Sequence, residues 1–181
     1  MTTQPIDVLG IGNAIVDVIA FTEDDFLIAH GLAKGSMRLI DEAEAEKLYQ
    51  AMGPATIISG GSAANTIVGI ASLGGHAAFI GKVRDDELGR AFSHDIRAVG
   101  VHFQTPQAQA GLKTARSFIL VTPDGERTMN TFLGACQALS VHDIDRDLVQ
   151  RSAITYLEGY LWDPADAKAA FRKAADFAHA A

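Results

Sequence analysis

The sequence predicts an α/β fold built on a parallel sheet. Short apolar runs alternate along most of the chain with segments whose apolar residues recur at helical spacing, the pattern of repeated βα units. One stretch departs from this alternation. Two strand-like segments flank the turn signal PDGE at residues 123–126, which predicts an antiparallel hairpin and therefore a smaller second β element.

Strands dominate the expectation for the first third of the chain. They lie at residues 6–12, extended by 14–21, then at 36–40 and 56–59. Two short helices separate them. Thr22 is expected to cap the first, over residues 23–30, whereas Asp41 with Glu44 resembles the capping box of the second, which reaches about Met52.

The middle of the chain continues the βα alternation. A helix follows the strand at 56–59 and ends near Leu73, where two glycines stop it. A strand at 76–83 then leads into a helix from Asp86 to about Val99. These segments continue the repeated βα unit of a parallel sheet.

The alternation resumes after the hairpin, which is expected at residues 113–132. A helix near 143–152 precedes a strand at 153–159, and Asp163 with Pro164 forms an N-cap and N1 pair for an alanine-rich helix. A crossover helix in a parallel sheet leads to a further strand. We therefore expect the fold to be cut short midway through its alternation.

Composition and charge exclude several classes of function. The chain has 181 residues, 15 basic against 22 acidic side chains, and a formal net charge of −7. An acidic surface repels phosphate backbones, so we expect no nucleic-acid and no membrane partner. The start MTTQPID lacks the regions of a signal peptide, and no apolar run is long enough to span a bilayer. These features predict a cytoplasmic protein.

Cysteine and histidine usage gives no sign of a metal centre. Cys136 is the single cysteine, which excludes an internal disulfide, fits a reducing compartment and is expected to be a buried small hydrophobe. The six histidines show no ligand spacing typical of zinc. The expected metal ligands are therefore none.

The stretch ATIISGGSAANTIVGIASLGG, residues 55–75, carries the first functional signal. Gly60 and Gly61 separate a strand from a helix, and such a junction offers backbone N–H groups, the positive end of a helix dipole and close approach to the backbone. It favours an oxygen-rich ligand. The alternative is an ordinary tight turn with Ser62 as N-cap. Asn65 suits a sugar hydroxyl, or satisfies local backbone groups.

Asp17 carries the second signal. Strand alternation places it on the same face as Ile15 and Ile19, and a carboxylate among apolar neighbours is costly unless a partner bonds to it. Two adjacent ligand hydroxyls would be such a partner. The alternative is an aspartate on an edge strand that faces water.

The segment GIGNAI at residues 10–15 matches a dinucleotide fingerprint in part. It supplies the first two glycines, but Ile15 stands at the third position and the chain continues as a strand. A NAD-dependent oxidoreductase is therefore only a distant alternative. The segment HAAFIGKV fails as a phosphate-binding loop because Val83 stands where a Ser or Thr must touch magnesium.

Several motifs coincide in order along nearly the whole chain. They are GNAIVD (12–17), KGSMRLID (34–41), GGSAANTIVGIASLGG (60–75), FIGKVRDDELG (79–89), TPDGERTMNTFLGA (122–135) and YLEGYLW (156–162). Together they resemble the ribokinase-like, or phosphofructokinase B, family of carbohydrate and nucleoside kinases. The resemblance is greatest to the adenosine-kinase-like branch, followed by the sugar kinases.

The resemblance implies a three-layer α/β fold with a parallel sheet and a small β lid. Residues 1–181 would form one incomplete domain, with lid segments at about 14–40 and 113–134. It implies a small-molecule nucleoside or sugar as ligand, and an exposed lid face could also pair two copies into a homodimer. The residues that it assigns to binding the sugar are Asn13 and Asp17 on the lid side and Gly60, Gly61 and Asn65 on the domain side.

The resemblance also implies ATP and Mg²⁺, with phosphate transfer to a primary hydroxyl. Arg127 matches a position associated with the transferring phosphate, where a planar cation suits developing charge; the alternative is a solvated charge beside a turn. The catalytic base of the family lies in a Gly-Ala-Gly-Asp segment that this sequence lacks. We therefore expect no catalytic base in this chain and no turnover by it alone. A non-catalytic sugar or nucleoside binding module is the rival function.

Asp85 and Asp86 belong to a family-like motif as well, but their position at a helix start is explained by capping and by the helix dipole. We assign both of them a structural role.

Overall fold

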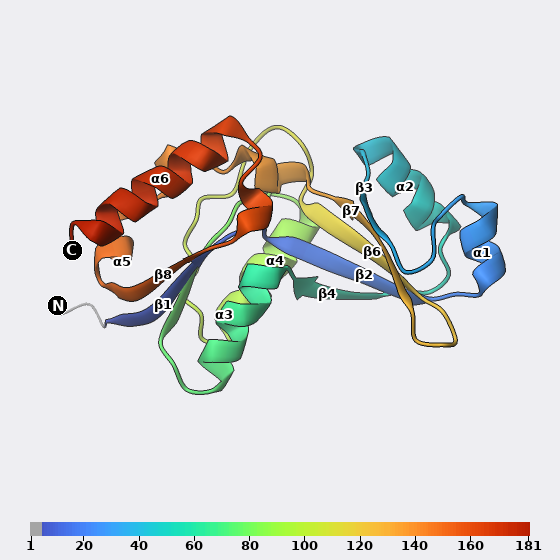
Figure 1. Cartoon of the computed structure of the whole chain (residues 1–181), viewed down its shortest axis with the longest axis horizontal. Coiled ribbons are helices and arrows are strands. Elements are labelled where there is room, and N and C mark those ends of the chain that lie inside the picture. The colour runs from blue at the N-terminus through green and yellow to red at the C-terminus, as the bar shows by residue number, and fades with distance from the viewer. Residues whose placement is uncertain (1–4) are drawn as a thin grey trace.

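Two β-sheets organise the chain, which is described here by a computed structural model over residues 5–181; part of the opening MTTQPID segment lies outside the described residues (Figure 1). The parallel sheet has the order β5-β1-β8, with all its strand pairs parallel. Its strands are β1 (Ile6–Ile11), β5 (Ala77–Ile80) and β8 (Ser152–Leu157).

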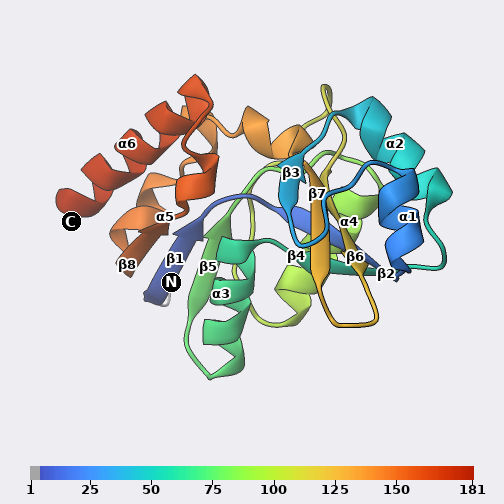
Figure 2. The same ribbon diagram turned by 45° about the vertical axis from the view of Figure 1, so that its right-hand side comes forward.

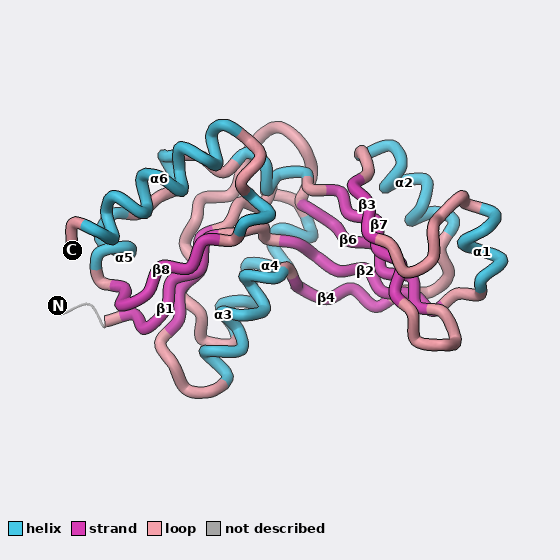
Figure 3. The backbone as a smooth tube through the Cα atoms, viewed as in Figure 1, coloured by secondary structure: helices cyan, strands magenta, loops and turns pink. Residues whose placement is uncertain are grey.

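The second sheet, called the mixed sheet, has the order β3-β7-β6-β2-β4. Its strands are β2 (Ile15–Phe21), β3 (Met37–Leu39), β4 (Thr56–Gly60), β6 (Ala115–Val121) and β7 (Arg127–Phe132). Figure 3 shows the strands of the two sheets as separate groups, joined where β1 passes into β2.

The helices divide between the two sheets. They are α1 (Asp24–Ala29), α2 (Glu42–Ala51), α3 (Ser62–Ser72), α4 (Glu87–Ala98), α5 (Arg146–Gln150) and α6 (Ala165–His179). Both ribbon views place α1 and α2 at the end of the molecule away from α5 and α6 (Figure 2). None of the helices in the described range is long and apolar enough to cross a membrane.

Helices pack against both faces of β1 and β5, whereas Ile154 and Tyr156 of β8 are exposed. On one face Ile11 and Ile80 pack with Phe171 and other residues of α5 and α6. On the other face Phe79 packs with Ile67 of α3 and with residues of α4. Continuous apolar runs such as β5, buried at every position, are typical of parallel strands covered twice. The predicted three-layer α/β fold is therefore confirmed.

The hairpin prediction is confirmed too. Strands β6 and β7 pair antiparallel, and the turn closes with the Thr122 amide donating to the Glu126 carbonyl at 3.0 Å, with Gly125 at φ 83°. The buried face of the mixed sheet includes Phe118, which packs with Leu27 of α1 and other residues of both α1 and α2. The mixed sheet thus has a hydrophobic core of its own.

Two strand predictions were wrong about the sheet. The stretch at 14–21 does not extend β1: the chain turns after Ile11, and β2 enters the mixed sheet. Strand β4, expected in the parallel sheet, pairs antiparallel with β2 as an edge strand. Its Ile57 and Ile58 are half exposed, and a short apolar run alone does not distinguish an edge strand from a buried one.

Helix starts were predicted best where an aspartate precedes the first turn. The Asp41 and Asp86 side chains accept from the backbone N–H groups three residues on, at 2.8 Å in each case. Three other starts shift by one residue: α1 follows Glu23 rather than Thr22, α3 follows Gly61 with no cap from Ser62, and α6 begins after Pro164.

Candidate functional site

Gly60 and Gly61 connect β4 to α3, and at each of them another part of the chain lies too close for a side chain. Gly61 has φ 100°, and a Cβ built on it would stand 2.6 Å from the carbonyl oxygen of Asn13. A Cβ on Gly60 would collide with the carboxylate of Asp17. The absence of side chains therefore lets this junction meet both the turn before β2 and the side chain of Asp17.

Asp17 lies half-buried on β2, on the face that it shares with Ile15 and Ile19. The strand register places Ile58 of β4 and Ser117 of β6 beside it, and neither carries a charge. No residue in the range 5–181 donates a hydrogen bond to its carboxylate. Burial raises the pKa of Asp17 from 3.8 to about 6. The Asp17 carboxylate is thus an acceptor in a partly dry position, ready for donors from a ligand.

Asn13 lies in the turn between the two sheets and is 2% exposed. Its backbone N–H and its side-chain Nδ2 both donate to Oε2 of Glu158, at 2.7 and 2.9 Å. Its Oδ1 is buried and has no hydrogen-bond partner within the described part of the chain. The Asn13 side chain is therefore held by Glu158 with one acceptor left over.

Glu158 is a site residue that the sequence reasoning missed. It follows β8 directly and is 2% exposed, and its Oε1 accepts from the backbone N–H of Ala63 in the first turn of α3 at 2.9 Å. One carboxylate thus joins the ends of β1 and β8 to the start of α3. The available signal was an acidic residue between an apolar strand and a glycine in the motif YLEGYLW.

The first turn of α3 is consequently less open than the sequence suggests. The Ala63 N–H is occupied by Glu158, and the Asn65 N–H donates to the Gly61 carbonyl at 2.8 Å. Glu158 also supplies the negative charge that favours a helix N-terminus. A ligand at this junction would therefore meet the glycine backbone and side chains rather than a free set of helix N–H groups.

Asn65 lies one turn into α3 with an exposed side chain. Together with Gly60 it lines a cavity of about 380 Å³ between β4, α3 and α4. Asp95 lines the same cavity and accepts from the Ser59 hydroxyl at 2.7 Å. Asn13 and Asp17 do not line this cavity. Asn65 and Gly60 thus line one cavity, and Asp17 lies outside it.

Arg127 lies apart from the other predicted site residues. It is exposed at the start of β7, opposite Val121, which in turn pairs with Phe21 at the far end of β2. Gly60 pairs with Ile15, six residues earlier on β2, a span of about 20 Å at the usual rise per residue. The role of Arg127 at a phosphate stays a prediction.

The described residues offer no cluster of side chains typical of a metal site. Residues 5–181 bring together no group of three or more His, Cys, Asp or Glu side chains suited to a cation. Mg²⁺ in phosphate-transferring proteins is usually held by one or two carboxylates together with waters and substrate phosphates, a smaller set of protein donors than such a group.

Comparison with solved structures gives the same fold over nearly the whole chain. The adenosine kinase from Sinorhizobium meliloti matches with a TM-score of 0.92 at 59% identity, and a probable sugar kinase protein from Rhizobium etli with 0.92 at 53%. Each match covers 98% of this chain and 54% of the other. The chain thus spans about half the length of these two proteins.

Curated relatives and a family model agree with this result. Probable fructokinase-7 from Arabidopsis thaliana is 37% identical over 97 residues, which are 52% of this chain and 28% of that protein. The model described as pfkB family carbohydrate kinase matches residues 8–181. The chain belongs to the pfkB family of carbohydrate kinases.

Proposed function

We propose that this chain carries the acceptor-binding part of a kinase that phosphorylates a primary hydroxyl of a nucleoside or a sugar. The observation that carries the proposal is the carboxylate of Asp17, which lies half-buried against Gly60 and lacks a protein donor among the described residues. A carboxylate in that position is costly unless hydroxyl groups bond to it.

A polyhydroxylated ring satisfies this site better than a ligand with a single polar group. Two neighbouring hydroxyls can donate to the two oxygens of Asp17, and such charge-assisted bonds are strong where water is partly excluded. The buried Oδ1 of Asn13 is a second acceptor without a partner in the described range. The proposed binding residues are Asn13, Asp17, Gly60, Gly61 and Asn65.

The phosphate donor is proposed from the family alone. Membership of the pfkB family supports ATP as donor with Mg²⁺, which neutralises charge on a transferring phosphate when it is bound. Arg127 is proposed as a stabiliser of that phosphate. Because the sequence lacks the Gly-Ala-Gly-Asp segment that carries the catalytic base of the family, we propose that this chain by itself binds acceptor without transferring phosphate.

Calorimetric titration of residues 1–181 with adenosine, ribose and fructose tests the proposal. We expect at least one of them to bind, and Asp17→Ala and Asn65→Ala each to weaken that binding by about 1 to 3 kcal/mol. Incubation with adenosine or fructose, ATP and Mg²⁺ should give no phosphorylated product. Unchanged affinity in both variants would move the site elsewhere, and measurable turnover would overturn the proposed inactivity.

Pairing of two copies through the mixed sheet is a separate proposal. Phe21, Met37 and Leu39 are 83%, 53% and 58% exposed, and strand alternation and register place them on the face that holds Asp17. Sedimentation velocity tests it: a dimer that becomes monomeric in Phe21→Ser would support pairing, and a monomer at all concentrations would exclude it.

A further inference from the structure

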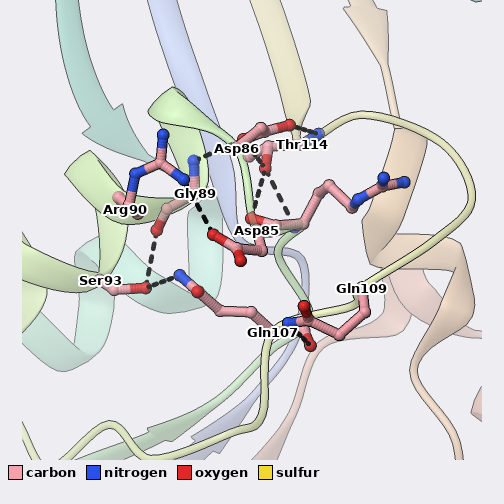
Figure 4. Close-up of polar contacts among 9 residues, drawn as sticks. Asp85, Asp86, Gly89, Arg90, Ser93, Gln107, Gln109 and Thr114 are labelled. Atoms are coloured by element: carbon pink, nitrogen blue, oxygen red, sulfur yellow. Dashed lines mark hydrogen bonds and ion pairs between the residues drawn. The ribbon is translucent and has the colours of Figure 1, made fainter.

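Asp86 bonds to a residue far beyond the helix that it caps. Its Oδ1 accepts from the Gly89 N–H at 2.8 Å, which is an ordinary N-cap of α4 (Figure 4). The same oxygen accepts from the Thr114 hydroxyl at 2.7 Å, and Oδ2 accepts from the Thr114 N–H at 2.9 Å. A helix cap requires only the first of these three bonds, so the two bonds to Thr114 call for another explanation.

Thr114 is the residue just before β6 and is fully buried. Its hydroxyl oxygen also accepts from the Arg84 N–H at 3.0 Å. A Cβ on Gly89 would collide with the Arg84 carbonyl and stand 2.9 Å from the Thr114 hydroxyl. The start of α4, the segment that follows β5 and the entry to β6 therefore meet with no space between them, as Figure 4 shows around Asp86.

Two further hydrogen bonds connect Gly89 at this junction with Ser93 of α4 and with Gln107. The Ser93 hydroxyl donates to the Gly89 carbonyl at 2.7 Å, and the Gln107 side chain donates to the Ser93 hydroxyl at 3.2 Å. Asp85 differs from its neighbour Asp86: it pairs with Arg90 at 2.8 Å, and both side chains are largely exposed. Among the described residues Asp85 makes no hydrogen bond to Thr114 or Gly89, so it serves as a matched control for Asp86.

The strand that starts at Thr114 leads straight to the candidate site. Strand β6 pairs with β2, and Ser117, three residues after Thr114, lies beside Asp17 in the register. Three residues of strand span about 10 Å. A displacement of β6 at Thr114 therefore also displaces Ser117 and its neighbour Asp17. Asp17 belongs to the mixed sheet, whereas α3 and the Asn13–Glu158 contact belong to the side of the parallel sheet.

We propose that Asp86 is a positioning residue for the acceptor site: by holding Thr114 against the start of α4, it sets where the mixed sheet presents Asp17 relative to the Asn13–Glu158 contact. That the site binds an acceptor rests on the proposed function, whereas the contacts between Asp86 and Thr114 do not depend on it. The three donors explain why an acid is needed. Only a carboxylate offers two acceptor oxygens, whereas an amide would place its NH₂ against the N–H of Thr114 or lose the cap.

Asp86→Asn tests the inference, because asparagine is as good an N-cap as aspartate and removes mainly the hold on Thr114. The first measurement is the titration of the Asp17 carboxyl carbon by NMR in residues 1–181 without ligand. We expect a midpoint near 6 for the unaltered chain and a midpoint moved toward 3.8 in Asp86→Asn, as the strand shift admits water. Asp85→Asn should titrate like the unaltered chain.

The second measurement is the affinity for adenosine, which should fall about tenfold in Asp86→Asn and stay unchanged in Asp85→Asn. An Asp86→Asn chain with the titration and affinity of the unaltered chain would show that Asp86 only caps α4.

If Asp86→Asn shows no melting transition, Thr114→Val replaces it and Thr114→Ser should restore both readings. If the unaltered chain binds none of adenosine, ribose or fructose, the proposed function fails, while the titration still decides the positioning role.

Discussion

The carboxylate of Asp17 lies directly against the backbone of Gly60. A Cβ built on Gly60 would stand 2.8 Å from the Asp17 Cγ and closer still to its Oδ2, so no other residue fits at this position without displacing the acid. Gly60 ends the strand that leads into α3, and Asp17 lies on the neighbouring strand of the mixed sheet. This contact is what brings the acid to the glycine junction.

Replacement of Gly60 by alanine should therefore weaken ligand binding by displacing Asp17. We expect Gly60→Ala to reduce the affinity for adenosine about tenfold or more, with a loss of stability of about 1 to 3 kcal/mol from overpacking. Gly69→Ala is the matched control, because Gly69 lies inside α3 and a Cβ there meets nothing within 4 Å. It should stabilise the chain by about 0.5 to 1 kcal/mol and leave binding alone. Equal affinity in the two variants would contradict this account.

The raised pKa of Asp17 predicts a pH dependence of stability. An acid whose pKa rises from 3.8 in the unfolded chain to about 6 when folded favours folding in its protonated form. The contribution of Asp17 to the free energy of unfolding is then largest below pH 3.8, and it falls as the pH rises to about 6. Allowing for partial exposure, the loss is about 2 kcal/mol relative to Asp17→Asn. Urea unfolding of both chains at several pH values measures it, and parallel curves would refute it.

Ligand affinity should move in the opposite direction. Hydroxyl donors bond best to the ionised carboxylate, so the affinity of residues 1–181 for adenosine should increase as pH rises through about 6 and then level off. The Asp17→Asn chain should bind more weakly and show no such rise. Calorimetry between pH 5 and pH 8, values chosen to bracket that pKa by about 1 to 2 units, makes the comparison. A rise of the same size in Asp17→Asn would assign it to another group.

Glu158→Gln should destabilise the fold. The carboxylate of Glu158 accepts three hydrogen bonds in a buried position, from two donors of Asn13 and from the Ala63 N–H. An amide satisfies fewer of them, and the expected loss of unfolding free energy is about 2 kcal/mol. Glu87→Gln, at an exposed position in the first turn of α4, should change stability by no more than about 0.5 kcal/mol. Chemical unfolding distinguishes the two, and similar values would mean that the Glu158 contacts contribute little.

Arg127→Ala should leave acceptor binding unchanged. The side chain is exposed at the start of β7, at the other end of the mixed sheet from Gly60. Its proposed role concerns phosphate alone, so the affinity for adenosine should match that of the unaltered chain within error. A clear loss of affinity in this variant would show that the acceptor reaches along the whole face of the sheet.

Local patterns predicted much of the fold because the signals lie within a few residues. The hairpin around residues 123–126, the capped starts of α2 and α4, and the apolar strand β1 all follow from neighbours in the sequence. Neighbouring residues do not predict the sheet to which β4 belongs, because Thr56–Gly60 would be the same apolar run in either sheet. Sheet membership depends on pairing with β2, about 40 residues away in the sequence.

The candidate site divides in the same way. Gly60, Gly61 and Asp17 stand out locally, as glycines between strand and helix and as an acid among apolar residues. Glu158 meets Asn13 across 145 residues of sequence, and no local pattern predicts that a carboxylate after β8 caps the start of α3. Likewise Asp86 reads correctly as a helix cap, but its bonds to Thr114 appear only in three dimensions.

The most direct test of the central claim is an NMR titration of the amide groups of residues 1–181 with adenosine, repeated with ribose and fructose. We predict that the amide signals of Asp17, Gly60 and Gly61 shift in a saturable way for at least one of these ligands. The amide of Arg127 should not move, and Asp17→Ala should abolish the shifts. The account would be contradicted if saturable shifts gathered elsewhere, or if none of the three ligands shifted the junction at any concentration.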